Sequence, residues 1–236
     1  LVHAYSNLGF TLLGMLIEQV SGMDLRSYLQ TRLLDPLHMG DSDFSPAAPS
    51  GAAAAAAYDP FGKPGEELPL RDTPAGGLNS TAPDLLQLAR LFFAEGRCEG
   101  LALLSPASVQ AMTTPQNLDC PLDADLRVGL GWHFAPDAVQ GGGPVLFHDG
   151  GTLCHRAVLM LLPQHRLAVS IMANSANAMP TLMDAAGYAL GVMLVAKSGI
   201  EPPLYPLNCR DRRYPAAALD TFVGSYDTPL GYVSIR

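Results

Sequence analysis

The pattern of apolar and polar positions predicts helices in the first half of the chain. Residues 8–20 are apolar on nearly every side, which predicts a buried helix that Ser6 or Asn7 can cap. Asp24 can cap a second helix, whose leucines lie roughly on one face and which ends at the Asp-Pro pair 35–36. The chain is therefore expected to open with two helices.

An irregular stretch, residues 45–63, follows these helices. It is rich in Ala, Pro and Gly, so we expect a long excursion on the protein surface. Behind it, Thr81 and Asp84 have the spacing of a capping box with Pro83 inside the first turn, which predicts the start of a third helix. The Ser-Pro pair 105–106 predicts the start of a further short helix.

The second half of the chain shows short apolar runs typical of β-strands. Residues 128–134 and 145–147 predict two strands, and residues 154–162 and 167–173 predict an antiparallel hairpin. An apolar helix is predicted at 181–196. Because helices, a hairpin and a helix follow one another without regular βαβ alternation, the predicted fold class is α+β.

A change of composition after residue 200 predicts a division of the chain. We expect one domain over residues 1–200 and, over 201–236, a Pro-rich linker and the start of an appended β module. Residues 220–236 carry aromatic and aliphatic side chains among Gly and Pro, which is typical of the first strands of such a module.

Composition and charge exclude several classes of protein. Hydrophobic residues make up 48% and charged residues 15% of the chain, which excludes a disordered chain and a coiled coil. The 22 acidic and 14 basic residues give a net charge of −8, which disfavours a nucleic-acid partner and electrostatic binding to membranes. The longest apolar stretch, 182–195, is too short for a transmembrane segment.

The cysteines and histidines do not predict a metal site. No C-x-x-C pair is present, and His148, His155 and His165 lack the spacing of helical ligands, so we expect neither a metal nor a cofactor. An even number of cysteines permits disulfides in an oxidising compartment, although buried thiols are the expectation for so scattered a set. The cysteines are Cys98, Cys120, Cys154 and Cys209.

Two short segments carry the candidate chemistry. Tyr5-Ser6-Asn7 would place a phenol and an amide at the start of the first helix. His148-Asp149-Gly150-Gly151 lies between two apolar strands, where glycines let a backbone or ligand approach closely. Each segment alone is equally typical of a packed helix start or a hairpin turn. The sequence contains no G-x-S-x-G, P-loop or H-E-x-x-H motif.

Taken in order, five segments form a recognisable set. They are a Tyr-x-Asn motif with its helix at 5–14, a Pro-Leu-His-Met segment at 36–42, a Pro-Ala-Gly-Gly-Leu stretch at 74–85, Gly-Leu-Gly-Trp at 129–132 and His-x-Gly at 148–150. Over residues 1–198 the chain resembles the serine β-lactamase and penicillin-binding-protein-like family, which includes class C β-lactamases, D-amino-acid peptidases and related esterases.

This resemblance implies an antiparallel sheet flanked by helices, and covalent acyl transfer. In the family a Ser, activated by a Lys one helical turn later, attacks a carbonyl, and water hydrolyses the acyl-enzyme. Tyr5 would share a proton with that Lys, and Asn7 would donate a hydrogen bond near the substrate carbonyl. His148 and Gly150 would form the His-x-Gly motif, with His148 where many members have Lys, and the Gly151 N–H would form half of the oxyanion hole.

Two departures from the family pattern bear on the substrate. His148 in place of Lys removes a fixed positive charge at neutral pH, and Asp149 in place of a hydroxyl residue would repel a substrate carboxylate. Both favour an esterase, amidase or peptidase, acting on a small molecule or peptide, over a true β-lactamase. The alternatives are a non-catalytic ligand-binding or sensor module and an interaction protein with a closed pocket, because fold does not fix function.

The nucleophile of the family has no counterpart in these residues. The two lysines, Lys63 and Lys197, belong to no Ser-x-x-Lys. We expect that motif to lie upstream of Leu1 and the appended module to continue past Arg236, so that this chain alone is inactive and associates through uncovered apolar surface. The resemblance further implies an exported bacterial protein, periplasmic or secreted.

Overall fold

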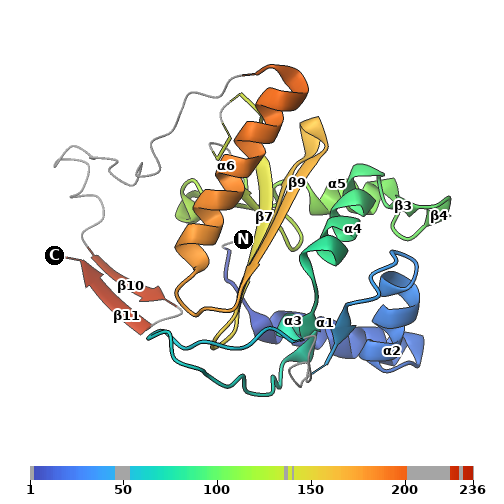
Figure 1. The fold of residues 1–236 in the computed structure, drawn as a ribbon, viewed down its shortest axis with the longest axis horizontal. Helices are drawn as coiled ribbons and strands as arrows, with labels where there is room; N and C mark the ends of the chain where they lie inside the picture. The colour runs from blue at the N-terminus through green and yellow to red at the C-terminus, as the bar shows by residue number, and fades with distance from the viewer. Residues whose placement is uncertain are drawn as a thin grey trace. The chain divides into compact units, whose positions relative to one another are not determined.

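The computed structural model describes residues 3–45, 54–135, 138–139, 141–200, 224–228 and 231–235. Its centre is a five-stranded antiparallel sheet with helices on both faces, an α+β architecture (Figure 1). The helices are α1 (Asn7–Ser21), α2 (Leu25–Leu29), α3 (Thr73–Gly76), α4 (Ala82–Phe93), α5 (Pro106–Met112) and α6 (Met179–Ser198). The strands of the central sheet are β5 (Arg127–Val128), β6 (His133–Ala135), β7 (Val145–Gly151), β8 (Arg156–Leu162) and β9 (Leu167–Ala173).

The short strands form three separate pairs. β1 (Asp43–Phe44) pairs with β2 (Leu78–Asn79), and β3 (Arg97–Cys98) pairs with β4 (Leu101–Ala102). β10 (Gly224–Thr228) and β11 (Gly231–Ile235) form an antiparallel hairpin within the 220–236 range where strands were expected. The chain clusters into two compact units, Leu1–Pro202 and Pro203–Arg236, of which the second contains this hairpin. The expected linker at 201–203 and Cys209 lie outside the described residues.

The expected hairpin in the second half is confirmed as β8 and β9. The two strands pair from Arg156↔Ala173 to Leu162↔Leu167. A single helical turn at Pro163–His165 joins them, and Arg166 closes it with a φ of 50°. Alternating side chains of these strands face opposite sides of the sheet, so the hairpin contributes to two hydrophobic cores.

Each face of the sheet has its own core. On one face, Leu146, Leu159 and Leu161 pack with residues of α4 and of the segment after α2. On the other face, Val158, Met160 and Leu162 pack against α6. The α6 side chains in this core are Leu182, Ala186, Leu190 and Leu194. Their spacing of four residues gives α6 a single buried stripe, as the helical period requires.

α6 is longer than its apolar stretch suggested. Its 20 residues are long and apolar enough, by length and composition alone, to cross a membrane. The buried stripe described above packs on β8 and β9, which is the arrangement of a core helix.

The helix starts confirm the predicted capping residues. Ser6 caps α1 by accepting a hydrogen bond from the Gly9 N–H, and Asp24 caps α2 through the Ser27 N–H. Thr81 accepts from the Asp84 N–H at the start of α4, with Pro83 in the first turn. These side chains satisfy backbone donors that have no partner inside the helix.

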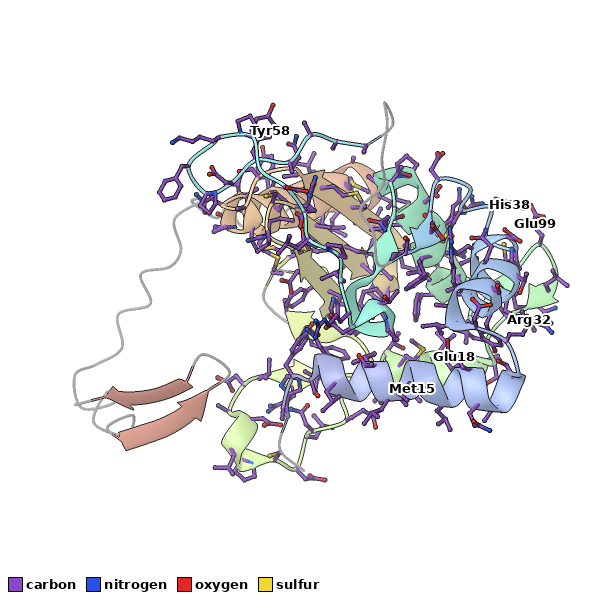
Figure 2. The ribbon with its side chains drawn as sticks, turned by 90° about the horizontal axis from the view of Figure 1, so that it is seen from below. Met15, Glu18, Arg32, His38, Tyr58 and Glu99 are labelled. Atoms are coloured by element: carbon purple, nitrogen blue, oxygen red, sulfur yellow. The ribbon has the colours of Figure 1, made fainter. Side chains whose placement is uncertain are left out.

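Two expectations about local structure are wrong. Residues 128–134 form two antiparallel strands, β5 and β6, and not one, because the chain reverses at Gly131, whose φ is 83°. The second concerns α1, which was expected to be buried. Its Gly14 is buried against Pro74, but most of its apolar side chains are exposed. Figure 2 shows α1 at the periphery of the fold, with Met15 and Glu18 on it.

The three described cysteines, Cys98, Cys120 and Cys154, are free thiols. Cys154 is buried, and burial raises its pKa, with the charges of Glu67 and Asp59 adding to the effect. At neutral pH the side chain is therefore held as a thiol and behaves as a small apolar group.

Candidate active site

Three imidazole rings gather at one end of the central sheet. The ring of His133 on β6 lies 5.8 Å from that of His3 and 5.6 Å from that of His148, centroid to centroid. Phe147 lies against the same ring at 5.4 Å. Burial lowers the pKa of His133, and the neighbouring His148 and His3 lower it further, although Asp149 opposes them. His133 is therefore biased towards its neutral form.

The segment before α1 is tied to this end of the sheet. The His3 N–H donates to both carboxylate oxygens of Asp123, at 2.9 and 3.2 Å, and Asn117 Nδ2 donates to the same carboxylate at 2.6 Å. The Asn117 amide and then the His3 N–H hold the pKa of Asp123 below its usual value. Asp123 is buried, and these donors compensate for the burial of its charge.

Tyr5 and Asn7 lie two and four residues after His3, and both are exposed. The Tyr5 side chain is 55% exposed. Asn7 is the first residue of α1, behind the cap made by Ser6. Within the described ranges, neither side chain makes a hydrogen bond, and no ring contact joins Tyr5 to His148. The structure thus brings the predicted tyrosine segment to the histidine cluster through His3, and the side chains of Tyr5 and Asn7 are exposed.

The His-x-Gly motif lies on an open edge of the sheet. β6 pairs with β7 only as far as Phe147, so in the described structure residues 148–151 pair with β8 alone. The Thr152 N–H donates to the His155 carbonyl at 3.0 Å and therefore points towards β8. Because donors alternate along an antiparallel strand, the Gly151 N–H points away from β8, towards the open edge. Gly150 and Gly151 are both exposed there.

The histidine cluster does not amount to a metal site. Among the described residues, no three His, Cys, Asp or Glu side chains are grouped so as to hold a metal ion. The arrangement offers an aromatic surface, made by the three imidazoles and Phe147, near an outward-facing backbone donor.

The chain is similar in sequence to a family of known proteins. A sequence profile described as Beta-lactamase matches residues 2–194 of the chain. The chain belongs to the beta-lactamase family. A "Probable hydrolase M10" of Phoma sp. is 28% identical over 184 residues, which are 76% of this chain and 28% of the relative.

Solved structures agree with this family. A protein described as SurE has a TM-score of 0.67 and 30% identity, covering 96% of this chain and 51% of its own. A class C beta-lactamase has a TM-score of 0.66 at 18% identity, covering 80% and 56%. The beta-lactamase fold expected from the motifs is therefore confirmed, and this family member spans about a quarter to a half of the length of the curated relatives.

The sequence predicted a set of site residues but not the residues around them. The predicted set is Tyr5, Asn7, His148, Gly150 and Gly151. His3 and His133 carry no motif, and their relation depends on contacts between residues more than 100 positions apart. Glu67, described below, lies beyond the excursion predicted at 45–63, in a stretch for which the sequence predicted no role. No local signal in the sequence distinguishes these residues.

Proposed function

We propose that this beta-lactamase family member is part of a serine hydrolase that cleaves an ester, amide or peptide bond through an acyl-serine intermediate. The nucleophilic serine and its lysine would come from outside these 236 residues. The observation that carries the proposal is the open edge of β7, where the Gly151 N–H faces outward beside His148. A similar protein described as a probable hydrolase supports the reaction class.

The proposed reaction has two acyl-transfer steps. The serine oxygen bonds to the substrate carbonyl carbon, and its proton passes to the lysine, which shares it with the Tyr5 phenol. The carbonyl oxygen becomes an oxyanion that accepts from the Gly151 N–H. The proton then moves to the leaving alcohol or amine as the bond between this group and the carbonyl carbon breaks. Water hydrolyses the resulting acyl-serine ester in a second step. One such backbone donor stabilises the transition state by about 3 kcal/mol.

The charges at the open edge indicate the substrate class. Asp149 is exposed next to the two glycines. A carboxylate on the substrate would meet this like charge, whereas the cation beside Gly151, Arg156, already donates to the Thr152 and His155 carbonyls. We therefore propose substrates whose end near β7 is neutral or cationic, with esters favoured over β-lactams.

The test uses the longest natural protein that contains this chain. It is incubated with a fluorophosphonate probe and with p-nitrophenyl esters, and mass spectrometry locates the modified residue. We expect a labelled serine in a Ser-x-x-Lys motif and ester turnover. A protein that takes no label and turns over no ester, yet binds ligand in the region of Tyr5 and His148, would instead be the non-catalytic binding module.

A matched pair of variants tests the backbone donor. Gly151→Pro removes the N–H, and no sheet hydrogen bond is lost because that N–H points away from β8. We expect kcat to fall about 100- to 1000-fold. Gly151→Ala keeps the donor and brings its Cβ to 3.3 Å from the Arg156 side chain, so it should lose far less. Equal losses in both variants would count against an oxyanion role.

A further inference from the structure

Side chains satisfy much of the backbone of the turn between β7 and β8. Residues 152–155 join the two strands, and the Thr152 N–H donates to the His155 carbonyl at 3.0 Å. The His155 N–H donates to the Thr152 hydroxyl at 3.2 Å. Two further side chains, described below, bond to the remaining polar groups of this turn.

One carboxylate, that of Glu67, meets the donors of the turn. Its Oε1 accepts from the Thr152 hydroxyl, from the Cys154 N–H at 2.7 Å and from His155 Nδ1 at 2.8 Å. Its Oε2 accepts from the Leu153 N–H at 3.2 Å. The Glu67 side chain is only 10% exposed, so these bonds compensate for burying its charge.

Arg156 satisfies the acceptors on the other side of the same turn. Its guanidinium donates to the Thr152 carbonyl and, at 2.7 Å, to the His155 carbonyl. The Glu67 carboxylate thus accepts from N–H groups of the turn at 152–155, and the Arg156 guanidinium donates to carbonyl groups of the same turn. We call this arrangement, made by Glu67 and Arg156 around residues 152–155, the turn clamp.

The loop that supplies Glu67 is itself fastened to the sheet. Asn174 Nδ2 donates to the Ala56 carbonyl at 2.6 Å, and Asn177 Nδ2 donates to the Pro60 carbonyl at 2.6 Å. The Ala176 N–H donates to the Tyr58 carbonyl at 3.3 Å. Figure 2 shows Tyr58 on this loop, on the far side of the molecule from α1. The segment that leads to Glu67 is thus bonded to residues 174–177 as well as to the turn.

The turn clamp adjoins the glycine that the mechanism uses. Gly151 immediately precedes Thr152 and pairs with Arg156 across the two strands. A shift of the turn would therefore rotate the outward-facing Gly151 N–H. We infer that Glu67 is a positioning residue, which acts through the β7–β8 turn to fix the direction of the Gly151 N–H at the open edge. The expected effect of Glu67 on turnover rests on the proposed function, whereas its expected effect on the backbone of the β7–β8 turn does not.

The experiment compares Glu67→Ala and Glu67→Gln with the matched control Glu66→Gln. Glu66 is the exposed neighbour of Glu67 and makes none of these bonds. Hydrogen–deuterium exchange by mass spectrometry on this chain follows peptides that span residues 150–156. The same substitutions in the longer natural protein are assayed for kcat and KM with an ester.

We expect exchange at 150–156 to accelerate at least about 10-fold in Glu67→Ala and less in Glu67→Gln, which keeps one acceptor oxygen. We expect kcat to fall up to about 100-fold in Glu67→Ala with little change in KM, because misplacement of a donor weakens the transition state and not substrate binding. Glu66→Gln should change neither quantity.

Three results would overturn the inference. Unchanged exchange in Glu67→Ala would show that the carboxylate does not hold the turn. Faster exchange with unchanged kcat in an active enzyme would show that the turn does not set the donor. A rise in KM alone would indicate lost binding and not lost positioning. A natural protein without turnover would contradict the proposed function, and the exchange data would still decide whether Glu67 fixes the backbone.

Discussion

Two carboxylates near β7 differ in what surrounds them, and so in what they can do. Glu67 is buried among donors from a single turn. Asp149 is exposed and has no hydrogen-bond partner within the described residues. The first carboxylate is fixed as an anion that organises the backbone. The second is free to act on an approaching substrate through its charge alone.

Replacing Asp149 tests this electrostatic effect. Removing a like charge about 4 Å from a substrate carboxylate in a water-exposed site is worth about 1 kcal/mol. In the full enzyme, Asp149→Thr is expected to raise kcat/KM for a carboxylate-bearing β-lactam about 5-fold and to leave a neutral ester unaffected. Steady-state assays on both substrates provide the comparison. An equal change for both, or no change for either, would contradict the proposed charge preference.

The carboxyl of Glu67 links stability to pH. Burial alone would raise its pKa, but the hydrogen bonds from Thr152, His155 and Cys154 outweigh burial and hold the pKa below its usual value. The folded state therefore binds a proton less readily than the unfolded state, so the contribution is complete above the ordinary glutamate pKa of about 4.3 and is lost as pH falls through the lower folded value.

Denaturant unfolding from pH 7 down to pH 3 measures this contribution. The free energy of unfolding of the wild type should fall below about pH 4.3 more steeply than that of Glu67→Gln. The charged group that acts on Glu67 is His155, which is kept in both proteins. Parallel pH profiles for the two proteins would show that another group dominates.

At the scale of elements, periodicity and capping predicted most helices and strands. Ser6, Thr81 and Ser105 each begin a helix where the sequence placed one, because a capping hydroxyl acts within three residues of itself. The burial of α1 could not be predicted in the same way. The apolar pattern of a helix predicts that its surface packs against something, but it does not indicate which segment covers that surface.

The exposed face of α1 gives a prediction about that partner surface. Leu12 and Leu16 are both 56% exposed. Replacing both with Gln should change the free energy of unfolding of this chain by no more than about 0.5 kcal/mol per residue, and should reduce self-association. Thermal unfolding and analytical ultracentrifugation measure the two effects.

A buried leucine provides the control for the α1 variants. Leu91 on α4 is 1% exposed, so Leu91→Gln should cost about 2–5 kcal/mol. If the α1 double variant were as unstable as this control, the face would be a core surface of the chain. If its association state were the same as that of the wild type, the apolar face would not be what brings copies together.

At the scale of the whole molecule, the motifs at residues 5–7 and 148–151 identified the fold because their order along the chain matches the family. The site around them was only partly predictable. His3 and Glu67 contact residues 85 or more positions away, and a single sequence does not encode such distances in any local pattern. The sequence thus predicted candidate residues, which stay a prediction, but not the residues that surround them.

Strands β5 to β9 lie in the sheet in the order in which the ribosome makes them. Each pairing closes a short loop at little entropic cost, whereas Glu67 must find a turn 85 positions further on. Topologies rich in local pairings form quickly, and distant contacts form slowly. In refolding, we therefore expect the sheet to form early and the turn clamp late. The sheet would then form before the Gly151 N–H takes its direction. Loss of the late contacts would leave a protein that is folded but inactive.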